Sequence, residues 1–221
     1  MPVPSFATQV LQTLAGALLL ISFAMLAERR SRRLVMLLIW QGTVLVMSTL
    51  LVATTAHLSH LFFSAALTLV LKVGVLPWIL LRLMHRLGIE RDNEPLVNVP
   101  TLMLVGLGLV IFAFGLAQPI TALATTVIRQ TLGIALAVIL LALLMILARR
   151  KAFTQVIAFL ALENGLFFAA TTTTYGMPMV VELGIALDVL VGVFIFGVFF
   201  FHIREQFDSL DLHHLESLKE D

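Results

Sequence analysis

The sequence predicts an all-α, polytopic membrane protein with seven transmembrane helices, its N-terminus outside and its C-terminus in the cytoplasm. Of its 221 residues, 60% are hydrophobic and only 12% are charged, and the mean hydropathy is +1.06. Soluble domains carry roughly 25% charged residues, so a soluble protein of this composition could not cover its surface with polar side chains. The apolar excess predicts contact with lipid and excludes a cytosolic enzyme, a nucleic-acid binder and a disordered protein.

Seven apolar stretches are each long enough to cross a bilayer, because a hydrocarbon core of about 30 Å requires roughly 20 helical residues. The run 100–148 is too long for one helix, and Pro119 with the polar residues 121–126 divides it in two. A turn at 175–178 precedes the last stretch. The predicted spans are approximately 7–27, 34–56, 61–83, 100–118, 127–148, 152–172 and 180–202.

We expect three parts along the chain: a four-helix transmembrane part over 1–118, a three-helix transmembrane part over 127–202 and a cytoplasmic acidic tail over 203–221. Residues 1–9 contain no Lys or Arg. A signal peptide begins with a positive region, so we expect the first helix to be retained. A net acidic tail avoids an anionic leaflet, which favours docking on a protein partner.

The distribution of Lys and Arg predicts the orientation. Twelve of the 14 lie on one side of the seven spans, namely Arg29, Arg30, Arg32, Arg33, Arg82, Arg86, Arg91, Arg149, Arg150, Lys151, Arg204 and Lys219. The opposite loops, 57–60, 118–128 and 173–179, contain neither, and Arg129 lies at the outer end of the fifth span. Positive charge marks the cytoplasmic side, and an even number of helices would break the alternation.

Four ionisable residues lie within the spans: Lys72, Glu163, Glu182 and Asp188. A charge at the bilayer centre costs about 2.5–3.5 kcal/mol or more. From the rise of an α-helix, Lys72 lies ~15 Å, Glu163 ~18 Å and Asp188 ~21 Å from the inner face, and Glu182 lies ~30 Å from it. Three charges at one depth on three helices predict a shared polar layer, which suits a proton relay.

Other interpretations of these residues stay open. The three charges could form a static polar clasp between helices, and Glu182 could simply contact water near the outer surface. Pro77, five residues after Lys72, predicts a helix break because proline has no N–H, and that break suits either hydration or packing. The 16 phenylalanines are most simply lipid-facing. Without cysteine the chain offers no thiolate metal site or iron–sulfur cluster, and we expect no catalytic residue, metal or cofactor.

Four stretches resemble component E of hydrogenase-4: Leu71–Pro77, Leu162–Gly165, Val181–Asp188 and Leu210–Lys219. The resemblance covers essentially the whole chain. The last three helices are also similar to the K subunit of respiratory complex I and the C subunit of multisubunit cation/proton antiporters. Asp188 matches the second of two buried glutamates in the complex I subunit, with Asp in place of Glu. Glu163 matches the first only approximately, displaced by about one turn.

The resemblance implies a non-catalytic membrane-arm subunit of a complex-I-related group 4 nickel–iron hydrogenase or formate hydrogenlyase, in a bacterial or archaeal cytoplasmic membrane. The implied partners are antiporter-like and quinone-site-type membrane subunits, soluble hydrogenase subunits indirectly, and the lipid membrane, with no nucleic acid. Lys72, Glu163 and Asp188 would form a relay for protons or sodium ions, with Glu182 as outer access point. The alternatives are a structural scaffold with no ion path of its own, an equivalent subunit of a cation/proton antiporter-like complex, a seven-helix receptor or retinal protein, and a stand-alone ion channel.

Overall fold

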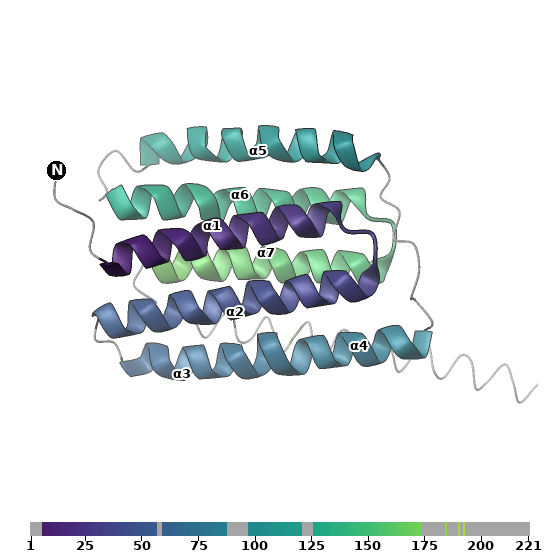
Figure 1. Cartoon of the computed structure of the whole chain (residues 1–221), viewed down its shortest axis with the longest axis horizontal. Helices are drawn as coiled ribbons and strands as arrows, with labels where there is room; N and C mark the ends of the chain where they lie inside the picture. Colours follow the sequence, from purple (N-terminus) through teal and green to yellow (C-terminus); the bar gives the residue numbers. More distant parts are fainter. Residues whose placement is uncertain are drawn as a thin grey trace, which may run out of the picture. The chain divides into compact units, whose positions relative to one another are not determined.

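The computed structural model describes residues 6–56, 59–87, 97–120 and 126–173, together with Gly184, Leu190 and Gly192. These residues form helices and no strand. The elements are α1 (Phe6–Ala27), α2 (Ser31–Ala56), α3 (Ser59–Thr68), the π-helical segment η1 (Leu69–Val75), α4 (Leu76–Leu87), α5 (Val99–Ile120), α6 (Thr126–Ala148) and α7 (Ala152–Thr173). The all-helical prediction is confirmed over this part of the chain (Figure 1).

Six helical stretches are long and apolar enough to cross a membrane. They are Phe6–Ala27, Ser31–Thr55, Leu61–His85, Val99–Gln118, Thr131–Ala148 and Ala152–Thr173. These match the first six predicted spans, and the third is built from α3, η1 and α4 in continuous succession. The predicted seventh span, 180–202, and the acidic tail lie outside the described residues except for the three isolated positions. The seventh helix and the orientation of the termini therefore stay predictions.

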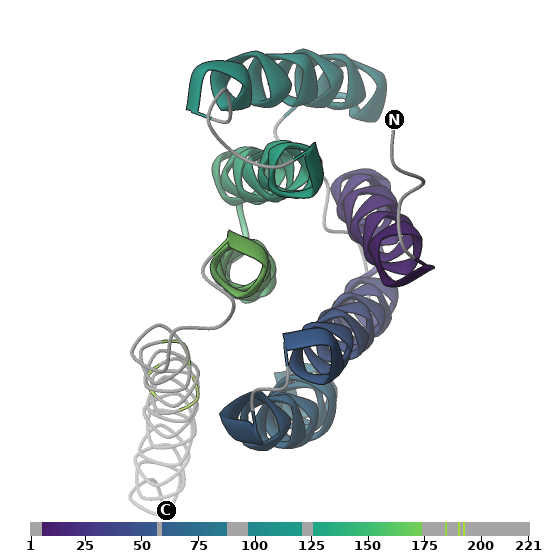
Figure 2. The same cartoon turned by 90° about the vertical axis from the view of Figure 1, so that its left-hand side faces the viewer.

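The chain divides into two compact units, Met1–Ile185 and Ala186–Asp221. All the helices described above belong to the first unit, and the three-part organisation expected from the sequence stays a prediction. Within the first unit, α1 packs against α2, α5 and α6, while α2 packs against α3, η1, α4 and α7. Figure 2 shows two facing rows, with α5, α6 and α7 in one row and α1, α2 and the α3–α4 helix in the other.

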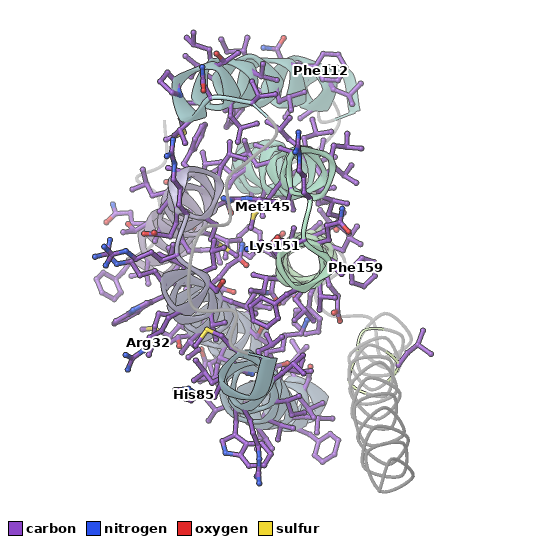
Figure 3. The ribbon with its side chains drawn as sticks, turned by 90° about the vertical axis from the view of Figure 1, so that its right-hand side faces the viewer. Arg32, His85, Phe112, Met145, Lys151 and Phe159 are labelled. Atoms are coloured by element: carbon purple, nitrogen blue, oxygen red, sulfur yellow. The ribbon has the colours of Figure 1, made fainter. Side chains whose placement is uncertain are left out.

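Helix α5 is the most exposed of the six spans and α7 the most enclosed. Only 17% of the apolar stretch in α5 is buried, against 61% in α7. Figure 3 shows Phe112 on α5 and Phe159 on α7 pointing away from their neighbours. Both side chains are exposed, as expected for lipid-facing phenylalanine.

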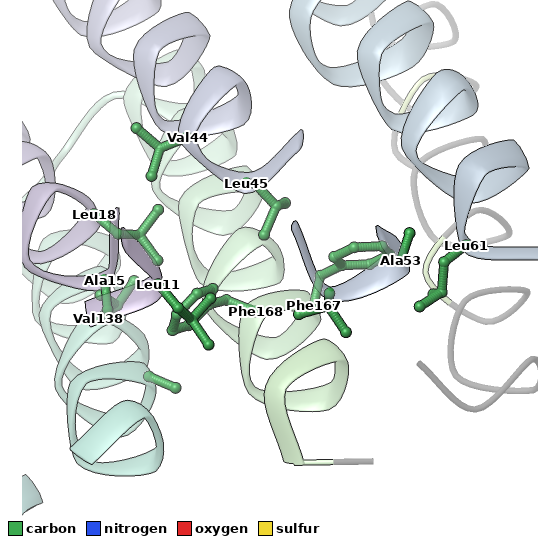
Figure 4. Close-up of a cluster of buried hydrophobic side chains, with 12 residues drawn as sticks. Leu11, Ala15, Leu18, Val44, Leu45, Ala53, Leu61, Val138, Phe167 and Phe168 are labelled. Atoms are coloured by element: carbon green, nitrogen blue, oxygen red, sulfur yellow. The ribbon is translucent and has the colours of Figure 1, made fainter. Parts of the chain in front are cut away.

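The apolar core of this unit joins five helices (Figure 4). Leu18 of α1, Leu45 of α2 and Phe168 of α7 lie at its centre and are fully buried. Phe153 and Phe167 of α7 are also buried, so the prediction that the phenylalanines face lipid is wrong for these three residues. The reason is that a membrane-protein interior is as apolar as the lipid tails, so hydrophobicity alone does not assign a side chain to either.

Arg149 ties the end of α6 to the end of α1. Its Nη2 donates hydrogen bonds to Met25 O at 3.2 Å, Leu26 O at 3.2 Å and Glu28 O at 2.5 Å. The last carbonyls of a helix lack intrahelical donors, and an Arg at that position satisfies them. Desolvation lowers the pKa of the buried Arg149 guanidinium, and nearby Glu28 opposes that shift. This basic residue therefore joins the end of α6 to the end of α1.

Candidate functional site

A buried ion pair joins the third span to α7. Lys72 Nζ lies 3.1 Å from Glu163 Oε1, and the two side chains are only 5% and 3% exposed. An isolated charge in an apolar interior is costly, and each of these groups offsets part of the cost of the other. Lys72 Nζ also lies 5.8 Å from the ring centroid of Phe167, within range of a cation–π contact. Glu163 and Phe167 are four residues apart, so one face of α7 presents both to Lys72.

Lys72 occupies the centre of the π-helical segment η1, Leu69–Val75. The N–H of Leu76 donates to Leu71 O, five residues earlier, which is the π pattern. The next such bond would need an N–H from Pro77 for the carbonyl of Lys72, and proline has none. Pro77 therefore helps to end the π segment where it does. Short π segments inside helices are rare and frequently lie at functional sites.

Gly42 lets α2 pass close to this segment. A Cβ atom on Gly42 would lie 3.3 Å from Val73 Cγ2 and 3.4 Å from Lys72 O. Gly165 does the same between α7 and α6, where a Cβ would lie 3.0 Å from side-chain carbons of Val138 and Ile139. Small residues allow membrane helices to approach closely: Gly42 brings the backbone of α2 near Lys72, and Gly165 brings α7 close to α6.

A chain of buried polar side chains starts beside Glu163. Asn164 Nδ2 donates to Gln41 Oε1 at 3.1 Å, and Gln41 Nε2 donates to Ser22 Oγ at 3.1 Å. Ser22 Oγ in turn donates to Leu18 O at 2.9 Å. All three polar side chains are buried, and they come from α7, α2 and α1. With Lys72 and Glu163 they make a polar layer that spans four elements of the first unit.

Two buried oxygens of this region have no hydrogen-bond partner within the described residues: Asn164 Oδ1 and Ser64 Oγ. Ser64 lies eight residues before Lys72 on the same helix, and the intervening Thr68 Oγ1 donates to Ser64 O at 2.8 Å. Buried polar atoms normally have a hydrogen-bond partner, either in the protein or in ordered water. Asn164 Oδ1 is therefore a buried acceptor of the layer that the contacts among the described residues leave unused.

The structure brings together two of the four residues that the sequence singles out, Lys72 and Glu163. Glu182 and Asp188 lie outside the described residues. Sequence reasoning missed Ser22, Gln41 and Asn164 as members of the layer. An uncharged amide in an apolar span was the available signal, since Gln41 and Asn164 stand within predicted spans. In the described part of the chain, no three His, Asp or Glu side chains gather as a metal ion would require.

The six apolar helices and the charged pair buried between them define a multi-pass helical membrane protein with a polar layer inside its transmembrane region. No family model and no solved structure matches the chain. The uncharacterized protein Rv0085 of Mycobacterium tuberculosis is 36% identical over 207 residues, which are 93% of this chain and 94% of that protein.

Hydrogenase-4 component E of Escherichia coli K12 is 24% identical over 218 residues, 96% of this chain and 98% of that protein. The component E of Shigella flexneri matches to the same extent. The chain belongs to the family that contains hydrogenase-4 component E and Rv0085. The family suggested by the sequence motifs is thus confirmed.

Proposed function

We propose that the chain is a membrane-arm subunit of a group 4 nickel–iron hydrogenase or formate hydrogenlyase-type complex, and that it contributes to proton or sodium translocation. The observation that carries the ion-path part of this proposal is the Lys72–Glu163 pair, two ionisable groups 3.1 Å apart inside the apolar helices. The membership of a hydrogenase complex is supported by the likeness to hydrogenase-4 component E over nearly the whole chain.

The pair can couple the movement of a proton to a rearrangement of charge. Two unit charges about 4 Å apart interact by about 4 kcal/mol at an effective dielectric constant near 20. Protonation of Glu163 would remove the negative charge that faces the ammonium group of Lys72. The ammonium group would then need another acceptor. Intramembrane acids and bases that exchange partners in this way mark proton paths in pumps and transporters.

The wider relay extends this proposal to residues outside the described part. Asp188 would accept the charge released by the pair, and Glu182 would provide access from the outer side. The N-terminus would be outside and the C-terminus in the cytoplasm, so that the basic loops face the cytoplasm. The acidic tail would contact a neighbouring subunit, and antiporter-like and quinone-site-type subunits would flank the helices in the membrane.

The test compares two variants of the ion pair and one control variant, each in the intact complex. Proton translocation is measured in inverted membrane vesicles, where hydrogen evolution drives quenching of a pH-sensitive dye. Glu163→Gln keeps a polar group of the same size and should reduce the quenching to background while the complex still assembles. The double variant Lys72→Met with Glu163→Leu should assemble at normal levels, because apolar residues of similar volume replace buried ion pairs at little cost. It should nevertheless fail to translocate.

A control variant tests loss of charge outside the layer. Arg150→Gln removes an exposed charge near the end of α6 and should leave dye quenching unchanged. The same vesicles are assayed with a sodium-sensitive dye, which identifies the transported ion. Normal translocation by both Glu163→Gln and the double variant would contradict the ion-path part of the proposal.

The second candidate function is a structural scaffold whose charges fix helix register. The hydrogen-bonded chain from Asn164 through Gln41 to Ser22 favours it, since such a chain fastens three helices together. A scaffold predicts that the double variant both assembles and translocates normally.

Purification in mild detergent distinguishes a hydrogenase from a cation/proton antiporter as the parent complex. Hydrogenase subunits should co-purify with the chain in the first case, and antiporter subunits in the second.

A further inference from the structure

A basic cavity lies where α2 begins and α4 ends, away from the ion pair. It encloses about 570 Å³ and is lined by Arg30, Arg32, Arg33, Met36, Leu81, Met84 and His85. Figure 3 looks at this end of the unit and shows Arg32 and His85 on the neighbouring helices α2 and α4. The cavity therefore combines a cluster of guanidinium groups with an apolar wall of two methionines and a leucine.

The positive charge of the cavity is only partly compensated within the described residues. Glu28 is the carboxylate at this corner, and its Oε1 accepts hydrogen bonds from the backbone N–H groups of Arg29 and Arg30, both at 3.0 Å. Its Oε2 lies 3.5 Å from Arg33 Nη1. Neither Arg30 nor Arg32 forms a salt bridge in the described part of the chain. Two exposed guanidinium groups thus remain to bind an anion.

Guanidinium groups bind phosphate through paired, charge-assisted hydrogen bonds. The apolar wall distinguishes among phosphate-bearing ligands. Leu81, Met84 and Met36 offer nothing to inorganic phosphate, while a hydrocarbon chain would be buried against them. Met36 is 42% exposed, so the wall continues onto the outer surface of α2. A ligand with a phosphate at one end and hydrocarbon at the other matches both parts of the cavity.

The position of the cavity along the helices matches such a ligand. The apolar stretch of α2 begins at Ser31, and that of the third span ends at His85, so the cavity lies at the boundary of the apolar zone. Deeper in the zone, Trp40 and Trp78 are exposed on the same two helices. The Arg82 guanidinium lies 5.1 Å from the Trp78 ring. Basic groups above exposed aromatic rings are typical of the membrane interface.

We propose that this cavity binds the headgroup of an anionic phospholipid, with the phosphate held by Arg30 and Arg32 and an acyl chain lying along Met36, Leu81 and Met84. Basic pockets between transmembrane helices bind anionic lipid headgroups at the membrane surface. This site is separate from the Lys72–Glu163 pair and does not depend on ion translocation. Its lipid stabilises the contact between α2 and α4 at one end of the third span.

The test measures binding to the purified full-length chain in mild detergent by native mass spectrometry. The probes are phosphatidylglycerol, phosphatidylcholine and inorganic phosphate. Phosphatidylglycerol should bind more tightly than phosphatidylcholine. The variant Arg30→Gln with Arg32→Gln should weaken phosphatidylglycerol binding by roughly 30-fold, since two cations are lost near the headgroup. The matched control, Arg150→Gln with Lys151→Gln, removes two charges at the α6–α7 corner and should bind like the native chain.

A second variant keeps the test decisive if the arginine variant does not fold. Met36→Glu places a carboxylate on an exposed position at the cavity mouth, where it should repel the headgroup without disturbing the core. Three results would overturn the proposal. They are equal binding of the two lipids, equal weakening by the α6–α7 control, and competition by millimolar inorganic phosphate that removes the lipid preference, which would indicate a site for a soluble anion.

Discussion

Asn164 and Gln41 are 123 positions apart in the chain, yet the amide of the first donates a 3.1 Å hydrogen bond to the amide oxygen of the second. This bond joins α7 to α2 one residue away from Glu163. It fixes the rotation of α7 about its axis and so the direction in which Glu163 meets Lys72. The amides of the layer are therefore positioning residues for the ion pair.

The hydrogen bond between Gln41 and Asn164 can be tested by a double-mutant cycle that measures the free energy of unfolding. Gln41→Leu should lower the free energy of unfolding by about 1–3 kcal/mol, because it leaves Asn164 Nδ2 buried without its acceptor. Asn164→Leu should act similarly. The double variant should lose less than the sum of the two, since neither amide then remains with a missing partner. Unfolding by denaturant titration in detergent micelles measures all four proteins, and additive losses would show that the two side chains are not coupled.

Gly42 predicts a steric effect on the π-helical segment. Gly42→Leu should displace η1, because even a Cβ would lie 3.3 Å from Val73 Cγ2, and should destabilise the protein by about 1–3 kcal/mol. Gly42→Ala should be milder, since the neighbours need to yield by only a few tenths of an ångström. Thermal unfolding in detergent, followed by circular dichroism, measures both variants.

Gly108 provides the matched control for Gly42. No atom lies within 4 Å of the position that its Cβ would take, so Gly108→Ala should stabilise α5 by up to about 1 kcal/mol through helix propensity. An equal gain from Gly42→Ala would show that α2 and η1 do not depend on this close approach.

Arg149 predicts a large structural effect for a residue at the end of a span. Arg149→Met should destabilise the chain by about 2–4 kcal/mol, because three carbonyls at the end of α1 lose a charged donor in a buried place. Arg149→Lys should recover only part of this, since an ammonium group lacks the planar fork of donors. The exposed neighbour variant Arg150→Gln should change stability by no more than about 0.5 kcal/mol. The three variants are compared with the native chain by the resistance of the α1–α2 corner to limited proteolysis.

Much of the fold follows from composition. Six spans of the described part match stretches read from hydropathy, because a helix that crosses lipid must satisfy its own backbone and cover itself with apolar side chains. Lys72 and Glu163 were also recognisable in advance, since charge inside such a span is costly and needs a partner. A disturbance near Pro77 was expected from the missing N–H, but its form, a π-helical segment centred on Lys72, was not.

The sequence by itself determined which stretches are long and apolar enough to cross a membrane and which ionisable residues lie within them. Only the tertiary structure decided which helices face each other, so that Glu163 of α7 meets Lys72 and Asn164 meets Gln41. It also decided that Phe167 and Phe168 face inward and that Arg149 holds the end of α1. The physical reason is that all faces of these helices are apolar, so the choice of neighbours rests on close glycine contacts and a few polar side chains.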